Sequence, residues 1–149
     1  MTTDPGRTER TAVHRNLLNT IVIDVPSPDV DRTVAFWSAA LGAIPIATRM
    51  PNYHILDDAA EPNRVVVQDA GTGAARVHFD VHTDDLDAEV DRLQRLGATV
   101  VDAQWADHPG RWVVMRDPAG LEFCVVWALN ELRPQSVRDD FELRSKPVD

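Results

Sequence analysis

The sequence predicts an α+β fold made of two βαβββ modules, and three observations support this. Short motifs recur about 55 residues apart: "IDV" at 23–25 returns as "FDV" at 79–81, and "LGA" at 41–43 returns at 96–98. Each copy contains one amphipathic helical stripe, and short apolar runs separated by turn residues follow it. Two copies are too few for a solenoid. We therefore expect two sheets side by side, with helices on the outer faces and a ligand groove between the inner faces.

The first module is expected at about residues 16–72. Its first strand is "LNTIVIDV" (18–25), which is rich in β-branched residues. Four apolar residues then recur at helical spacing, and Gly42 fits the end of that helix. They are Val30, Val34, Trp37 and Leu41. Three short strands follow, at about 43–49, 52–57 and 63–69.

The second module is expected at about residues 73–129 and repeats the order. The run "RVHFDVH" (76–82) predicts a strand. A helix with Leu86, Val90 and Leu93 on one face follows and ends at Gly97. The last three strands are "ATVVDAQ", "RWVVMRD" and "LEFCVVW", and a Pro-Gly turn joins the final two.

We place the domain at residues 16–129. The two ends of the chain are more polar and lack its apolar periodicity. Residues 1–15 are polar, without periodicity, and predict a flexible arm. Residues 130–149 form a charged tail. Three of its apolar residues could dock against the body while the rest is partly disordered. They are Val137, Phe141 and Leu143.

The composition excludes several classes of function. The formal charge of −9 argues against a nucleic-acid partner, because phosphate backbones repel an acidic surface. No apolar run approaches the ~20 residues of a membrane span. The first fifteen residues lack the apolar stretch of a secretory signal. Cys124 is the only cysteine, so an internal disulfide is impossible. We expect a cytoplasmic protein.

Three segments carry a family resemblance: "DVPSPDVDRTVAFWSAALGA", "VHFDVHTDDLDAEVDRLQRLGA" and "MRDPAGLEFCVV". With them the chain resembles the vicinal oxygen chelate superfamily of glyoxalase I, bleomycin-resistance proteins and extradiol dioxygenases, and above all its bacterial glyoxalase-like domains. The resemblance implies a mixed, mainly antiparallel, half-open barrel with helices outside, and a homodimer. It does not fix a reaction, since one fold hosts many activities.

Metal-dependent relatives take one ligand from the first and one from the last strand of each module. Carried over position by position, these ligand sites fall on Val22, Gln68, His78 and Cys124. Valine cannot ligate a metal, and glutamine is a poor ligand. Catalytic zinc usually keeps three protein ligands, and non-haem iron two histidines and a carboxylate. We therefore expect no cofactor; if a metal binds, His78 and Glu122 are the residues expected to hold it.

Two residues are the predicted catalytic pair. His78 alternates with Arg76 and Asp80 on one face of its strand, which favours a polar groove floor, and an unperturbed histidine can act as acid or base. Glu122 lies in an otherwise apolar strand and could orient His78. The alternatives are a buried histidine bonded to Asp80 or Glu122, and a Glu122–arginine ion pair. Four further residues are expected to bind substrate: Gln68, Asp80, Trp112 and Cys124.

The favoured hypothesis is a small-molecule enzyme of lyase or isomerase type without the family metal. Two alternatives stay open. The first is a non-catalytic binding protein of the bleomycin-resistance kind, for which the acidic charge would favour a cationic ligand. The second is a metal-dependent glyoxalase- or dioxygenase-type enzyme that completes its ligand set from a second subunit.

Overall fold

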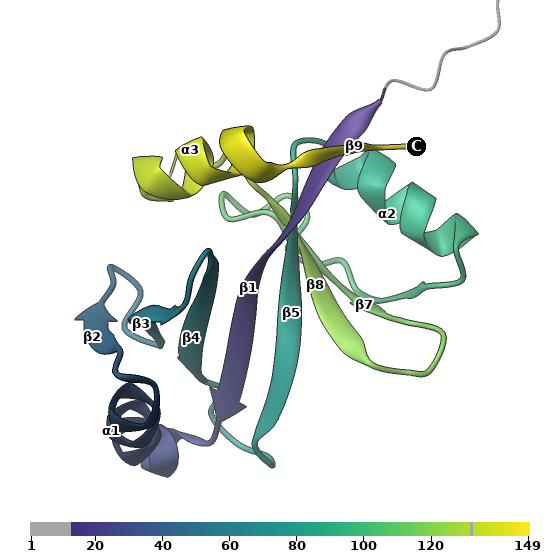
Figure 1. Ribbon diagram of the computed structural model, residues 1–149. Coiled ribbons are helices and arrows are strands. Elements are labelled where there is room, and N and C mark those ends of the chain that lie inside the picture. Colours follow the sequence, from purple (N-terminus) through teal and green to yellow (C-terminus); the bar gives the residue numbers. More distant parts are fainter. Residues whose placement is uncertain (1–12, 132) are drawn as a thin grey trace, which may run out of the picture.

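Strands β1 (His14–Val25) and β5 (Arg76–Thr83) pair antiparallel and form the middle of a single sheet. This is a computed structural model that describes residues 13–131 and 133–149. Figure 1 shows the two central strands side by side, with one module on either side of them. The described residues form nine strands and three α-helices, and the sheet does not close into a barrel. The predicted α+β, half-open arrangement is confirmed.

The two modules repeat the same order of elements. The first contains β1, the 3-10 turn η1 (Ser27–Asp29), α1 (Val30–Leu41), β2 (Ile44–Ala47), β3 (Tyr53–Ala60) and β4 (Asn63–Asp69). The second contains β5, α2 (Leu86–Arg95), β6 (Thr99–Asp102), β7 (Trp112–Arg116) and β8 (Glu122–Trp127).

The sheet is mixed, and its order is β2-β3-β4-β1-β5-β8-β7-β6. The pairs β1–β4 and β5–β8 are parallel, and every other pair is antiparallel. In each module, the last strand thus pairs in parallel with the first strand of the same module. The antiparallel β1–β5 pair joins the two modules and places their first strands side by side in the sheet.

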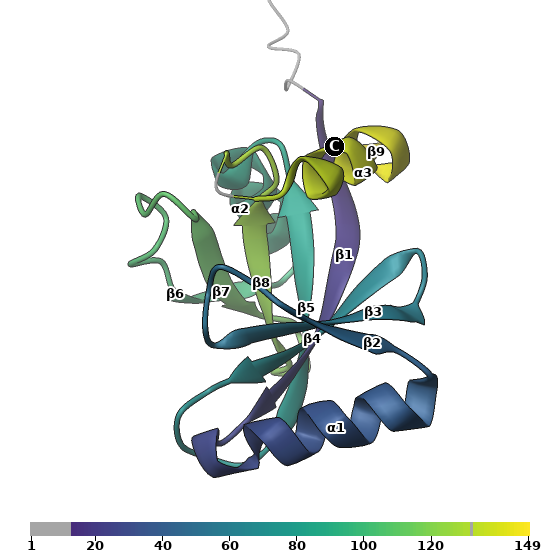
Figure 2. The same cartoon turned by 90° about the vertical axis from the view of Figure 1, so that its left-hand side faces the viewer.

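Each helix covers the outer face of its own module. In the first module, Val34 and Trp37 of α1 pack on a core that includes Val65 and Val67 of β4. In the second, Leu86, Val90 and Leu93 of α2 pack with Val113, Met115 and Val125. Figure 2 shows α1 and α2 at opposite ends of the twisted sheet. The predicted stripes are confirmed, except that Leu41, the last residue of α1, is exposed.

Both glycines predicted to end the helices adopt backbone angles that other residues rarely take. Gly42 has φ +64° and Gly97 has φ +105°. A residue with positive φ within the first two positions after a helix turns the chain toward the next strand. Gly42 begins the path to β2, and Gly97 begins the path to β6.

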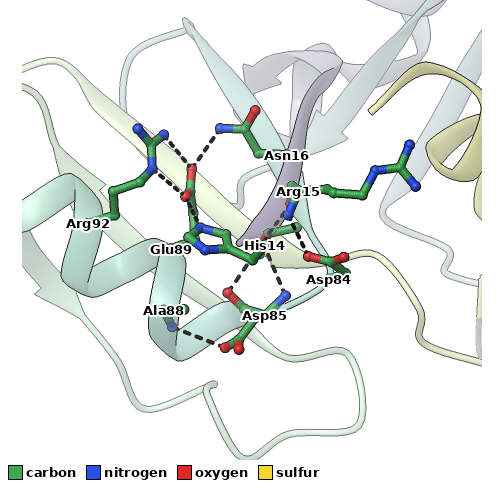
Figure 3. Close-up of polar contacts among 9 residues, drawn as sticks. His14, Arg15, Asn16, Asp84, Asp85, Ala88, Glu89 and Arg92 are labelled. Atoms are coloured by element: carbon green, nitrogen blue, oxygen red, sulfur yellow. Dashed lines mark hydrogen bonds and ion pairs between the residues drawn. The ribbon is translucent and has the colours of Figure 1, made fainter. Parts of the chain in front are cut away.

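The N-terminal boundary differs from the expected one. The flexible arm was expected to reach residue 15, but β1 begins at His14, so His14 and Arg15 belong to the sheet. His14 is buried, and its Nε2 lies 2.6 Å from a carboxylate oxygen of Glu89, which Asn16 and Arg92 also contact (Figure 3). A buried carboxylate needs such partners. The rest of the expected arm, residues 1–12, lies outside the described residues.

The C-terminal tail is more ordered than expected. It contains α3 (Gln135–Arg144) and β9 (Lys146–Val148), which pairs antiparallel with the start of β1. Val137 and Phe141 are buried, as the docking hypothesis requires, but Leu143 is 83% exposed and does not dock. The tail therefore extends the expected domain, since apolar burial and strand pairing both hold it.

In the part of the chain that the structure describes, no helix is long and apolar enough to cross a membrane.

Candidate functional site

The inner face of the two central strands carries the candidate site. Val22 of β1 lies opposite His78 of β5, and Asp24 lies opposite Arg76. Residues that face each other across paired strands share one side of the sheet. Because Ile21 and Ile23 pack toward α1, the alternate residues Val22 and Asp24 point to the inner face. His78 therefore shares the inner face of the sheet with Asp24, Arg76 and Asp80, the polar residues around it.

Two carboxylates hold the imidazole ring of His78. Its Nδ1 lies 2.5 Å from Oδ2 of Asp24, and its Nε2 lies 3.3 Å from Oδ1 of Asp80. Asp24 reaches the ring diagonally from the neighbouring strand, whereas Asp80 lies two residues further along β5. The side chain of His78 is only 11% exposed. The ring is thus fixed in orientation by one carboxylate on each nitrogen.

This arrangement determines the charge of His78. Burial alone would lower the pKa of the imidazole, but the hydrogen bonds with Asp24, Asp80 and Cys124 outweigh burial and raise the pKa to about 11. His78 is therefore an imidazolium at neutral pH, with both nitrogens protonated. This result corrects the expectation of an unperturbed histidine that could serve as a base.

Three further partly buried polar groups, Cys124, Tyr53 and Arg133, interact with His78 or Asp80. Burial raises the pKa of the Cys124 thiol, so the thiol stays protonated at neutral pH and is not an activated nucleophile. Burial also raises the pKa of Tyr53, and the negative charge of Asp80 raises it further. Arg133, from the segment after β8, donates from Nε to the backbone oxygen of Trp127. Burial lowers the pKa of its guanidinium, and the negative charge of Asp80 partly offsets this effect.

Glu122 does not contact His78, so the predicted base-and-orienter pair is wrong. Its carboxylate accepts from Arg76 at 2.6 Å and from Arg116 at 2.9 Å. The alternative reading, an arginine ion pair, is the observed one. Asp24 takes the orienting place that was expected for Glu122. Both His78 and Glu122 nevertheless line one surface hollow of about 250 Å³.

The other predicted substrate-binding residues are distributed over the inner face. Asp80 and Cys124 lie opposite each other on β5 and β8, directly beside His78. Gln68 lies opposite Asp24 on β4, one strand further away. Trp112 stands apart: its ring stacks on Trp105 at 4.9 Å, in an aromatic cluster at the β6–β7 connection. The structure thus brings Asp80 and Cys124 to His78, but not Trp112.

The four ligand positions implied by the family do not fit a metal. Val22 is fully buried and offers no ligand atom, and Gln68 lies on β4, which β1 separates from the β5 strand of His78. A different group does come together: His78, Asp80 and Cys124 each offer one ligand atom, and these atoms lie within 4.8 Å of one another. The predicted pair for a metal, His78 and Glu122, is not part of one such group in the described residues.

Sequence reasoning missed Asp24, Tyr53 and Arg133. Asp24 had a usable signal, because "IDV" at 23–25 and "FDV" at 79–81 are the repeated motif. Asp24 and Asp80 are therefore equivalent residues of the two modules, and the antiparallel β1–β5 pairing places one on each side of His78. Tyr53 and Arg133 carried no such signal, since their positions depend on how β3 pairs within the sheet and on the path of the segment after β8.

Comparisons with known proteins agree with this fold. The family model of the glyoxalase-like domain matches residues 20–126. The chain therefore belongs to the glyoxalase-like domain family, within the vicinal oxygen chelate superfamily. No match is found among curated proteins.

Three solved structures illustrate the similarity. Methylmalonyl-CoA epimerase from Mycobacterium tuberculosis is 17% identical, with a TM-score of 0.56 over 74% of this chain and 86% of that one. The epimerase from Streptomyces coelicolor is also 17% identical, with a TM-score of 0.52 over 79% and 98%. A Legionella pneumophila structure titled NAD-dependent benzaldehyde dehydrogenase is 12% identical, with a TM-score of 0.56 over 75% and 97%. At these identities the similarity concerns the fold alone.

Proposed function

We propose that this protein is a small-molecule enzyme of isomerase or lyase type that works with its own side chains and without the family metal. The single observation that carries the proposal is the ring of His78 held between the carboxylates of Asp24 and Asp80 on the inner face of the sheet, a pairing that favours the protonated ring. A fixed N–H donor with positive charge is suited to stabilise an oxyanion that develops during a reaction.

The chemistry that follows is proton transfer next to a carbonyl group. On binding, the carbonyl oxygen of the substrate would take over the Nε2–H of His78 from Asp80, whose contact of 3.3 Å is the longer of the two carboxylate contacts. The carboxylate of Asp80, released from the ring, would then accept the neighbouring C–H proton. The bonding pair would move into an enolate, whose oxygen His78 stabilises. Return of the proton to carbon gives isomerisation, and loss of a leaving group gives a lyase reaction. Asp24 is a positioning residue, because it holds the opposite ring nitrogen.

The test measures exchange of α-hydrogens for deuterium. A panel of small carbonyl compounds in D₂O is followed by proton NMR with the wild-type protein and with His78→Gln, which keeps the size but removes the charge. Exchange should disappear in His78→Gln and Asp80→Asn and persist in the control His108→Gln, since His108 lies in an exposed loop. Exchange that is undiminished in His78→Gln would reject the assignment. Ligand binding without any exchange would favour the bleomycin-resistance-like alternative.

A second candidate is a metal-dependent enzyme, and one observation favours it. The ligand atoms of His78, Asp80 and Cys124 lie within 4.8 Å of one another, and Asp24 holds the second ring nitrogen, as carboxylates often do behind a metal-bound histidine. Three protein ligands would leave an open position, at which a bound metal would act as a Lewis acid.

Metal analysis separates the two candidates. Protein purified without chelator is measured for metal content and then titrated with Co²⁺, while thiolate-to-cobalt absorption is recorded. One metal per chain, together with an absorption band that Cys124→Ser abolishes, would favour the metal enzyme. Substoichiometric metal and no thiolate band are expected under the primary proposal. The homodimer stays a prediction, which light scattering in solution can check.

A further inference from the structure

Two exposed guanidinium groups line the hollow beside His78, although the whole chain carries a formal charge of −9. Its charged lining residues are Arg76, Arg116, His78 and Glu122. Asp24 and Asp80 lie against the ring of His78, so that ring is already paired with carboxylates. The two arginines are therefore the cations that a ligand in the hollow can reach.

Glu122 holds both guanidinium groups in place. Arg76 donates to one of its carboxylate oxygens at 2.6 Å, and Arg116 donates to the other at 2.9 Å. Arg76 also lies 3.4 Å from Asp24, the residue that fixes His78. The hydrogen bond from Arg76, and after it the one from Arg116, keeps the pKa of Glu122 below its ordinary value. Glu122 is therefore an ionised clamp rather than a base.

The hydrogen bonds to Glu122 leave further N–H donors on both arginines. A guanidinium has five N–H donors, and each of these contacts uses only one of them. The side chains are 59% and 51% exposed, so their remaining donors can reach a ligand. Planar guanidinium groups bind carboxylate and phosphate with paired, charge-assisted hydrogen bonds.

From these contacts we propose that the hollow is a receptor for an oxyanion group of the substrate, a carboxylate or a phosphate. Arg76 and Arg116 bind the anion. Glu122 is the positioning residue, because its two carboxylate oxygens hold one guanidinium group each. The proposal rests on the proposed function for one point, namely that the bound molecule reacts at the neighbouring His78. It implies that the substrate is an acid or a phosphorylated compound.

A purely structural role for these residues makes a different prediction. Arg116 and Glu122 lie opposite each other in the β7–β8 pair, so their ion pair could simply support that hairpin. Exposed ion pairs contribute only about 0–1 kcal/mol to stability. In that case, small anions would not bind saturably in the hollow and would have only the non-specific effect of added salt.

The test observes the arginine side chains directly in ¹⁵N-labelled protein. The Nε–H signals of Arg76 and Arg116 are followed by NMR during titration with malonate, inorganic phosphate or the neutral analogue malonamide. Saturable shifts at both arginines are expected with malonate or phosphate and not with malonamide. Tighter binding of malonate would indicate a carboxylic acid substrate, and tighter binding of phosphate a phosphorylated one.

Variants decide which groups bind the anion. Arg116→Gln should weaken binding by roughly tenfold or more, the loss of one charge-assisted contact, whereas the exposed control Arg95→Gln should not change it. Glu122→Gln should also weaken binding if Glu122 positions the arginines; tighter binding in Glu122→Gln would overturn that role. Absence of saturable shifts, or equal shifts with malonamide, would overturn the receptor itself. Because this test reads binding and not turnover, its failure is distinguishable from failure of the exchange assay.

Discussion

Replacing Asp24 with asparagine should weaken the fold in a manner that depends on pH. The substitution keeps the size of the side chain but removes the negative charge 2.5 Å from Nδ1 of His78 and 3.4 Å from Nε of Arg76. Hydrogen bonds to charged groups contribute about 1.5–3 kcal/mol, and breaking a buried ion pair costs about 3–5 kcal/mol. Since Asp80 still faces the ring, we expect a loss of about 2–3 kcal/mol in the free energy of unfolding.

The sign of the pH dependence follows from the raised pKa of His78. Its pKa is about 11 in the folded protein and 6.5 ordinarily. The stabilisation is therefore complete below about pH 6.5 and is lost as the pH rises through about 11. A loss of 2–3 kcal/mol corresponds to a fall of roughly two in the pKa of His78. The difference between wild type and Asp24→Asn should therefore be largest at acidic to neutral pH and smaller near pH 10.

Urea unfolding at about pH 6 and about pH 10 measures this difference for the wild type and the variant. Asp107→Asn is the matched control, because Asp107 is exposed and forms no ion pair among the described residues. Its unfolding free energy should stay within about 0.5 kcal/mol of the wild-type value. A loss in Asp24→Asn below about 0.5 kcal/mol, or a loss that is equal at both pH values, would refute the reasoning about His78.

Three further outcomes are expected. Glu89→Gln should destabilise the protein by about 3–5 kcal/mol in urea unfolding at neutral pH, because three side chains hydrogen-bond its fully buried carboxylate. Burial raises the pKa of Glu89, but the hydrogen bonds from Arg92, Asn16 and His14 outweigh burial and lower the pKa overall. The stability that the wild type has over Glu89→Gln should therefore be present above pH 4.5 and be lost as the pH falls below that value. Phe141→Ala should cost about 3–5 kcal/mol, whereas Leu143→Ala should change stability by less than about 0.5 kcal/mol in the same assay; equal effects would contradict the packing of α3. Gly42→Ala should cost about 1–2 kcal/mol in thermal unfolding, because its φ is +64°.

Local patterns were sufficient to predict most of the fold. The spacing of apolar residues predicted that α1 and α2 pack against the sheet, and the "LGA" repeats marked where each helix ends. The C-terminal segment was the main difference. Its helix is largely polar and buries only Val137 and Phe141, so its periodicity is weak, and β9 depends on a partner strand at the other end of the chain. Such long-range pairing leaves little trace in a local pattern.

The candidate site was predicted only in part, and the reason lies in strand register. His78, Asp80 and Cys124 were expected on the inner face from alternation along their own strands, and they lie there. Which carboxylate reaches His78 depends on how β1 and β5 align, and this alignment selects Asp24 instead of Glu122. The pKa of His78 could not be predicted before that partner was known, because it depends on burial and on both carboxylates together.

NMR of the ring nitrogens of His78 tests the central claim most directly. In ¹⁵N-histidine-labelled protein titrated from about pH 5 to pH 11, the ring should keep the imidazolium signature throughout the neutral range and lose a proton only near pH 11. A ring that loses its proton near pH 6.5 would show that Asp24 and Asp80 do not hold it charged, and would contradict the proposed role as a charged donor to the substrate.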